Sequence, residues 1–161
     1  MSEASTGDDA THPGPATAPI TAAIVQAMID HARAEYPNEM CGVIVGDRPA
    51  AAGGRALRWE PARNEAASPY RYRVHPDDLF RLTLATDDAD EVFWAIAHSH
   101  VRSPAVPSPT DIGAATYPEA LYVLVSLSED EAGPDGTPGV RAWRIVDGAV
   151  HEVVLEVVSA S

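Results

Sequence analysis

The segment HSHVRSPAVPSPTD, residues 98–111, combines side chains that commonly bind metal ions. His98 and His100 are two positions apart, so in a β-strand both imidazoles point to the same side. Two neutral imidazoles and one carboxylate can hold Zn²⁺ and leave its fourth position for water. Asp111 is the nearest candidate carboxylate. The spacing therefore predicts a metal site where a strand ends and a short helix begins.

Each part of this segment also has a purely structural explanation. A His-x-His pair occurs often by chance, and two partly exposed histidines at a strand end need no metal. Ser108 can be a helix N-cap, Pro109 the first helical residue, and Asp111 the acceptor that completes a capping box. The two interpretations are compatible, because a cap that fixes the start of the helix also aims Asp111.

The joint pattern is more specific than its parts. His-x-His, seven residues and Ser-x-x-Asp, with Glu39 at the head of an earlier strand, resemble the JAMM (MPN-type) metalloprotease family. The resemblance implies that His98, His100 and Asp111 bind one zinc ion per chain. It also implies that Glu39 is the general base and that Ser108 donates a hydrogen bond to the oxyanion.

The resemblance covers roughly residues 20–150 and is greatest to the small bacterial branch, which includes Mec-type peptidases that free cysteine from a sulfur-carrier protein. It implies a zinc-dependent peptidase or isopeptidase acting at the C-terminal tail of a ubiquitin-like or sulfur-carrier protein. Release of cysteine, as in cysteine biosynthesis, and cleavage of a lysine isopeptide both stay open. One departure is Val101, where many members have proline. The alternative function is a non-catalytic MPN-type scaffold, although scaffolds usually lose the ligand set that this chain retains.

Other polar residues are weaker candidates. Cys41 is the only cysteine and lies in an apolar strand, so it is predicted to be core, although it shares a strand face with Glu39. Asn64 can hydrogen-bond a substrate backbone or end a strand. Arg71 and Arg73 can receive an acidic carrier protein or form a solvated strand face.

Hydrophobic periodicity predicts the elements that must position these residues. Helices are expected over residues 20–36, 76–90 and 109–116, the first of them ended by Pro37. Strands are expected over residues 39–47, 55–64, 70–74, 91–100 and 120–127, followed by a hairpin over 140–158 that turns at Asp147-Gly148. The sum is a mixed α/β (α+β) fold, one central sheet flanked by two main helices. The family resemblance implies the cytidine-deaminase-like MPN sandwich.

Composition limits the class of protein. The chain of 161 residues is expected to form one domain, residues 19–161, after a disordered tail, residues 1–18. A net charge of −13 argues against binding of nucleic acid or of an anionic membrane surface. A single cysteine and the lack of a long apolar run predict a cytoplasmic protein without disulfides. The sequence does not decide the oligomeric state, and a homodimer stays open.

Overall fold

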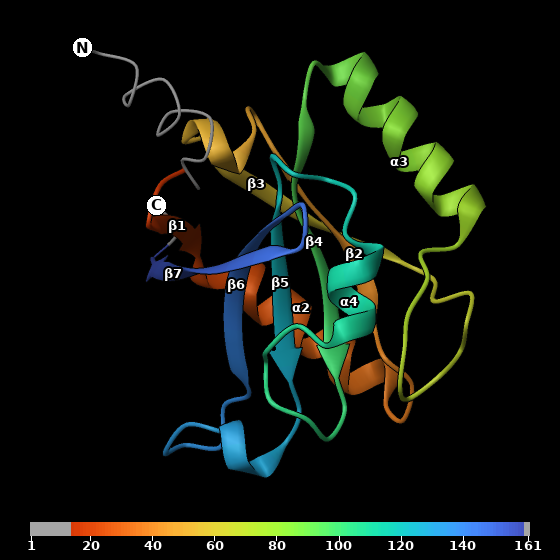
Figure 1. The fold of residues 1–161 in the computed structure, drawn as a ribbon, viewed down its shortest axis with the longest axis vertical. Coiled ribbons are helices and arrows are strands. Elements are labelled where there is room, and N and C mark those ends of the chain that lie inside the picture. The colour runs from red at the N-terminus through yellow and green to blue at the C-terminus, as the bar shows by residue number, and fades with distance from the viewer. Residues whose placement is uncertain (1–13, 160–161) are drawn as a thin grey trace.

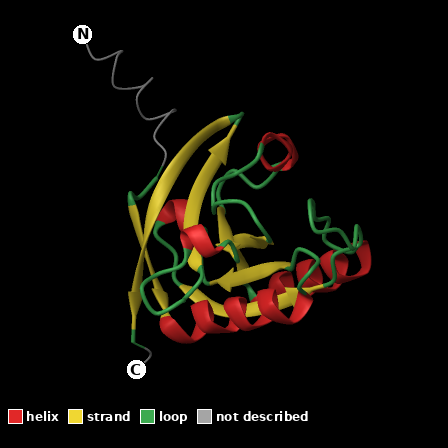
Figure 2. Ribbon diagram, turned by 90° about the horizontal axis from the view of Figure 1, so that it is seen from below, coloured by secondary structure: helices red, strands yellow, loops and turns green. Residues whose placement is uncertain are grey.

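A seven-stranded mixed sheet forms the centre of the computed structural model, which describes residues 14–159 (Figure 1). The strands, in the spatial order β1-β7-β6-β5-β4-β2-β3, are β1 (Thr17–Thr21), β7 (Ala149–Val158), β6 (Gly139–Val146), β5 (Leu121–Ser126), β4 (Val92–His100), β2 (Cys41–Gly46) and β3 (Ala56–Ala62). The pairs β4/β5 and β1/β7 are parallel and the other pairs are antiparallel. The sheet curves strongly when viewed from below (Figure 2). The predicted mixed α/β fold is confirmed.

Helices cover both faces of this sheet. Helix α2 (Ala22–Glu35) packs its buried face on one side, against a core that includes Trp94 of β4. Helices α3 (Pro76–Ala89) and α4 (Pro109–Ala114) cover the other side, and in Figure 1 α4 lies in front of the strands while α2 lies behind them. Two 3₁₀ turns, η1 (Ala50–Ala52) and η2 (Glu129–Glu131), lie in loops. Within residues 14–159, no helix combines the length and apolar character that crossing a membrane requires.

The N-terminal end of the fold differs from the expectation at a few residues. Ile20, predicted to begin the first helix, belongs to β1, because the Thr21 hydroxyl caps α2 by accepting a hydrogen bond from the Ile24 N–H at 3.3 Å. Of the predicted disordered tail, residues 1–13 lie outside the described residues. Thr17 and Ala18, which were assigned to that tail, pair with β7 as part of β1.

The predicted strand over residues 70–74 is wrong. Only Val74 pairs there, in an isolated bridge with Asn64. The Asn64 side chain makes four hydrogen bonds, to the backbone of Glu39, Ala66, Arg71 and Arg73. Since one amide side chain takes up these backbone groups, the segment forms a loop in place of a strand. Tyr70 is therefore 82% exposed, whereas Tyr72 faces the protein interior.

Candidate metal centre

Strand β4 ends with the two histidines of the segment 98–111. The strand lies between β2 and β5, so both of its edges are paired, and helices cover both faces of the sheet. His98 and His100 are therefore only 1% and 5% exposed. Their ring centroids lie 5.1 Å apart in a T-shaped arrangement. Strand periodicity therefore places both imidazoles on the sheet face that α4 covers, as the spacing predicts.

Helix α4 brings Asp111 to these histidines. The Ser108 hydroxyl accepts from the Asp111 N–H at 3.1 Å, and Asp111 Oδ2 accepts from the Ser108 N–H at 2.9 Å. This is the predicted capping box. The carboxylate oxygens lie 3.3 Å from His98 Nε2 and 3.0 Å from His100 Nε2. One ligand atom from each of the three residues lies within 4.8 Å of the others, and Asp111 belongs to both the cap and the cluster.

The hydrogen bonding of the two rings fits a cation between them and the carboxylate. His100 faces an acceptor at each nitrogen, the Pro104 carbonyl at 2.7 Å from Nδ1 and Asp111 Oδ2 at 3.0 Å from Nε2. A neutral imidazole has one N–H. In one of these two contacts a lone pair of the ring nitrogen would therefore face a lone pair of the oxygen. His98 Nε2 makes no hydrogen bond despite its 3.3 Å contact. A divalent cation would satisfy these lone pairs, and two imidazoles with one carboxylate match the donor set of catalytic zinc sites.

The charge states also suit a ligand set. Burial lowers the pKa of His98, which favours the neutral ring that can donate a lone pair. Burial alone would disfavour the Asp111 charge, but the contacts with His100 and His98 hold the pKa of this carboxyl well below its usual range. Burial also opposes protonation of His100, yet Asp111 and the Pro104 carbonyl raise its pKa. A metal ion would therefore compete with a proton for His100.

Glu39 lies beside this cluster, in the irregular segment just before β2. Its N–H donates to the Ser68 carbonyl at 2.8 Å, and its carbonyl accepts from the Asn64 amide at 3.1 Å. The following N–H, of Met40, donates to the Ser99 hydroxyl at 2.7 Å. The side chain is 4% exposed, and Oε1 has no hydrogen-bond partner within the described residues. Burial raises the pKa of Glu39 to about 7, although His100 opposes the shift.

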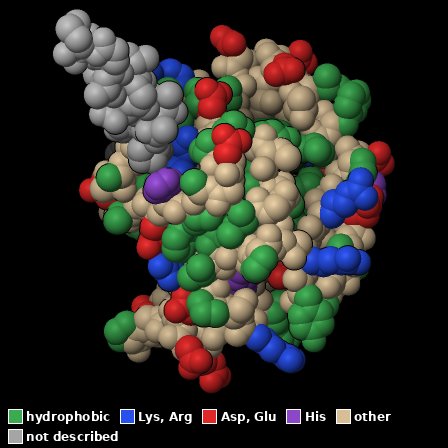
Figure 3. All heavy atoms as spheres, in the orientation of Figure 1, with side chains coloured by type: hydrophobic (Ala, Val, Ile, Leu, Met, Phe, Trp, Pro, Cys, Tyr) green, Lys and Arg blue, Asp and Glu red, His purple; other side chains and the backbone are tan. Residues whose placement is uncertain are grey.

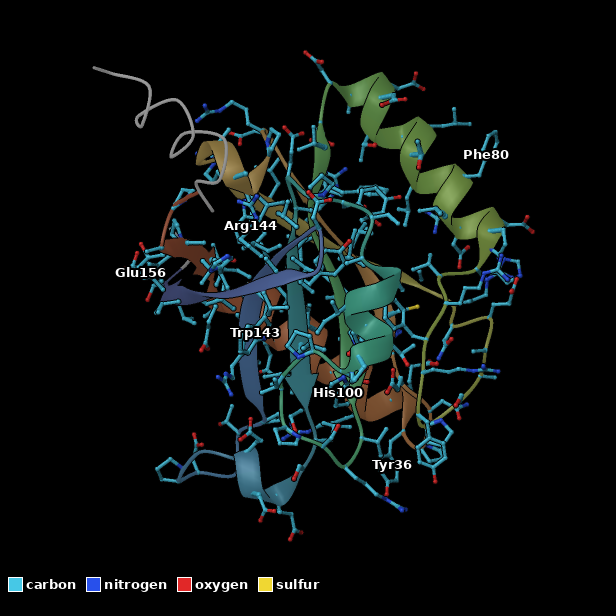
Figure 4. The ribbon with its side chains drawn as sticks, viewed as in Figure 1. Tyr36, Phe80, His100, Trp143, Arg144 and Glu156 are labelled. Atoms are coloured by element: carbon cyan, nitrogen blue, oxygen red, sulfur yellow. The ribbon has the colours of Figure 1, made fainter. Side chains whose placement is uncertain are left out.

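A pocket of about 350 Å³ opens onto these groups. Glu39, His100 and Ser108 contribute to its lining, together with uncharged residues such as Pro37 and Tyr70. Figure 4 labels His100 close to α4, and in Figure 3, from the same side, a histidine is visible in a recess of the surface. A substrate could therefore reach the buried cluster from solvent.

Comparison with known proteins identifies the family. Residues 21–146 match the family described as prokaryotic homologs of the JAB domain. The chain belongs to this family. The resemblance to JAMM-type proteins that the sequence motif suggests is thereby confirmed, and this JAB domain has the expected sandwich of helices around a mixed sheet.

Relatives of this JAB domain include named peptidases. The CysO-cysteine peptidase of Mycobacterium tuberculosis (strain ATCC 25618 / H37Rv) is 41% identical over 139 residues, which are 86% of this chain and 90% of the relative. The desampylase of Haloferax volcanii is 31% identical over 122 residues, which are 73% of this chain and 81% of the relative. The solution structure of protein DSY2949 from Desulfitobacterium hafniense matches with a TM-score of 0.75 and 27% identity, covering 89% of this chain and 94% of that one. Neither this single described chain nor these relatives support a homodimer.

The weaker candidates from the sequence make structural contacts near the candidate metal centre of this JAB domain. Cys41 is fully buried, with Sγ 3.4 Å from the Arg63 carbonyl, and burial raises the pKa of its thiol to about 12. Cys41 is therefore a core residue. Its thiol stays neutral, and a neutral thiol is a poor nucleophile. Arg73 forms an ion pair with Glu65 at 2.9 Å. Asn64 organises the loop after β3 and holds the Glu39 backbone.

Two residues near the cluster were missed from the sequence. Tyr72 stacks on His98 with ring centroids 4.1 Å apart and an interplanar angle of 20°. Ser99 points away from the histidines and fixes the N–H that follows Glu39. Ser99 lies between the two histidines at the end of an apolar strand, which is a detectable signal for this residue. No local pattern indicates Tyr72, because its contact depends on how the loop of residues 64–74 folds back.

Proposed function

We propose that this protein is a zinc-dependent peptidase that hydrolyses an amide bond at the C-terminal tail of a ubiquitin-like or sulfur-carrier protein. The observation that carries the proposal is the convergence of His98, His100 and Asp111, with ligand atoms within 4.8 Å, beside the buried carboxyl of Glu39. The names of the relatives support the substrate class, since they refer to a CysO-cysteine peptidase and a desampylase.

Each side chain has a role in this proposal. His98, His100 and Asp111 would hold one zinc ion, which supplies a Lewis acid that activates water for attack on an amide. Glu39 accepts a proton from the attacking water and delivers it to the leaving amine. The water oxygen bonds to the carbonyl carbon as the C=O π electrons move onto oxygen. The C=O bond then re-forms as the C–N bond breaks, so the products are a carboxylic acid and a free amine. In the metal-free protein burial raises the pKa of Glu39 to about 7, and a raised pKa suits a group that must both accept and deliver a proton.

Ser108 is the proposed donor to the oxyanion. Its oxygen already accepts from the Asp111 N–H, and within residues 14–159 its own proton has no acceptor. Ser108→Ala should therefore lower kcat by roughly 10²–10³-fold, because one oxyanion donor is lost. It should also lower stability by about 1 kcal/mol, because the cap is lost. Steady-state kinetics and thermal unfolding measure the two effects on the same preparation.

Ser108→Thr is the matched control, because threonine keeps a hydroxyl that can cap the helix and donate. It should retain most of the turnover. Equal loss of kcat in both variants would contradict the donor role. So would a loss of activity in Ser108→Ala that its smaller folded fraction fully explains.

The proposed function is tested with a panel of conjugates. The zinc-loaded protein is incubated with CysO-cysteine, with a ubiquitin-like carrier joined to a lysine ε-amine, and with an unrelated linear peptide, each with and without chelator. Mass spectrometry of the products should reveal chelator-sensitive cleavage directly after the carrier tail and no cleavage of the linear peptide. The scaffold alternative predicts intact conjugates in every sample.

A further inference from the structure

The pocket beside the His98, His100 and Asp111 cluster is lined by one side chain that is always positively charged. Arg102 lines this pocket together with Glu39, His100 and Ser108. The other lining residues are uncharged: Pro37, Pro69, Tyr70, Val101 and Ser103. An anionic part of a substrate that enters the pocket would therefore meet a single guanidinium, two residues along the chain from His100.

Arg102 has no partner among the described residues, unlike most arginines of this chain. Five arginines form ion pairs with acidic side chains, and a sixth donates to a backbone carbonyl: Arg58, Arg63, Arg73, Arg81, Arg141 and Arg144. The guanidinium of Arg102 makes neither kind of contact within residues 14–159. The chain carries 24 acidic residues against 11 arginines, so acids are not scarce. An arginine side chain that lines the pocket without an ion-pair partner can bind an anionic group of a substrate.

The backbone around Arg102 is held firmly. The next three carbonyls each accept a hydrogen bond from a side chain of the sheet, Ser103 from Ser126, Pro104 from His100 and Ala105 from Trp143. Val101, just before Arg102, is 6% exposed. Figure 4 labels both His100 and Trp143 on this side of the sheet. The backbone that carries Arg102 is therefore already fixed, so binding of an anion would order only its solvent-facing side chain and would cost little backbone entropy.

We propose that Arg102 binds the free α-carboxylate of the amino acid that is released, so that the enzyme prefers substrates with a single residue beyond the scissile amide. This inference rests on the proposed function. The leaving amine takes its proton from Glu39, so the released residue must lie in the pocket that Glu39 lines. A guanidinium fork can bind a carboxylate through two parallel N–H···O bonds. A volume of about 350 Å³ lies at the small end of ligand sites and suits one residue with the adjoining extended chain.

The same chemistry separates the two kinds of leaving group. A lysine within a folded protein leaves through its ε-amine and carries no carboxylate near that nitrogen. A C-terminal amino acid such as cysteine carries its carboxylate one carbon from the leaving nitrogen. Arg102 therefore favours release of a terminal amino acid over cleavage of an isopeptide.

The test compares three substrates with the zinc-loaded protein. They are CysO-cysteine, the same conjugate with its terminal carboxylate converted to a carboxamide, and CysO joined to the ε-amine of Nα-acetyl-lysine amide. We expect wild-type kcat/KM for the free acid to exceed that for the carboxamide by about tenfold or more, mostly through KM. Arg102→Gln should reduce kcat/KM for the free acid to the value for the carboxamide. It should change kcat/KM for the carboxamide by less than about threefold. Arg102→Lys should restore part of the preference, because it keeps the charge and loses the fork.

Arg48→Gln is the matched control. It removes an exposed arginine beyond the end of β2 that lies farthest from the cluster, so the preference should be unchanged. If the wild type cleaves none of the substrates, the proposed function itself fails. If it cleaves the free acid and the carboxamide equally well, or if Arg102→Gln slows both to the same extent, the role of Arg102 is wrong and the peptidase function stands.

Discussion

Glu39→Gln is expected to lose nearly all hydrolytic activity while zinc stays bound. Glutamine has nearly the same shape as glutamate and leaves His98, His100 and Asp111 intact, but its amide cannot accept a proton from water. General acid–base catalysis typically contributes 10²–10⁴-fold, so kcat should fall by about that factor. Metal analysis and cleavage of CysO-cysteine, measured on the same sample, check both parts of the expectation.

The same substitution should stabilise the metal-free protein at alkaline pH. Burial raises the folded-state pKa of Glu39 from its ordinary 4.5 to about 7, so the folded state binds this proton more tightly than the unfolded state does. The wild type therefore loses stability as the pH rises from the unfolded value through 7. Glutamine has no charge to bury, so metal-free Glu39→Gln should be more stable by about 1–3 kcal/mol at pH 8, with little difference below pH ~4. Thermal unfolding at the two pH values measures this.

Glu35→Gln serves as the control for both measurements. It removes a carboxyl that is 43% exposed, four residues earlier in the chain, and should leave turnover nearly unchanged and give no comparable gain in stability at pH 8. Near-normal turnover of Glu39→Gln would refute the assignment of Glu39 as the base. A melting temperature that does not rise in the metal-free variant would show that the buried carboxyl carries no such cost.

His98→Ala should lose zinc and activity together. The imidazole is 1% exposed and is one of three side chains whose ligand atoms converge. Two protein ligands are too few for a stable catalytic zinc site, so the metal content should fall from about one ion per chain to a small fraction. Activity should then match that of the chelator-treated wild type. Atomic absorption and the CysO-cysteine assay provide the two measurements.

The fold of His98→Ala should persist. Loss of the ring leaves a cavity that costs about 1–3 kcal/mol. The substitution also removes two buried ring nitrogens that lack hydrogen-bond partners, which offsets part of this cost. His151→Ala, at an exposed position on β7, is the matched histidine control and should keep zinc and turnover. Global unfolding of His98→Ala on circular dichroism, or full zinc occupancy, would overturn the assignment.

Several elements could be predicted from the sequence because their causes are local. The Ser108–Asp111 capping box depends on residues three apart, and it forms as the motif predicts. The hairpin turn at Asp147-Gly148 has φ values of 50° and 81°, which a two-residue turn of this kind requires. The almost continuously apolar run of β4 predicted a central strand, and the strand lies between β2 and β5. The cap and the turn depend on neighbours in sequence, and the apolar composition of β4 fits a strand that is buried on both faces.

The segment over residues 70–74 had the alternation of a strand and did not become one. Alternation predicts only which side chains could share a face, whereas a strand also needs a partner for its backbone groups. The side chain of Asn64 supplies those hydrogen bonds. The resulting loop buries Tyr72 against His98 and provides the Ser68 carbonyl that fixes Glu39.

The amino-acid sequence alone determined the residue types of the cluster, their family resemblance, and the strand and helix that carry His98, His100 and Asp111. Only the tertiary structure decided that Glu39, 59 residues before His98 in the chain, has its carboxyl buried beside them, and that Arg102 lines the same pocket without a partner. The physical reason is that caps and strand periodicity act over a few residues. Burial, the pKa of a carboxyl and the pairing of a guanidinium depend instead on groups that folding brings together from distant parts of the chain.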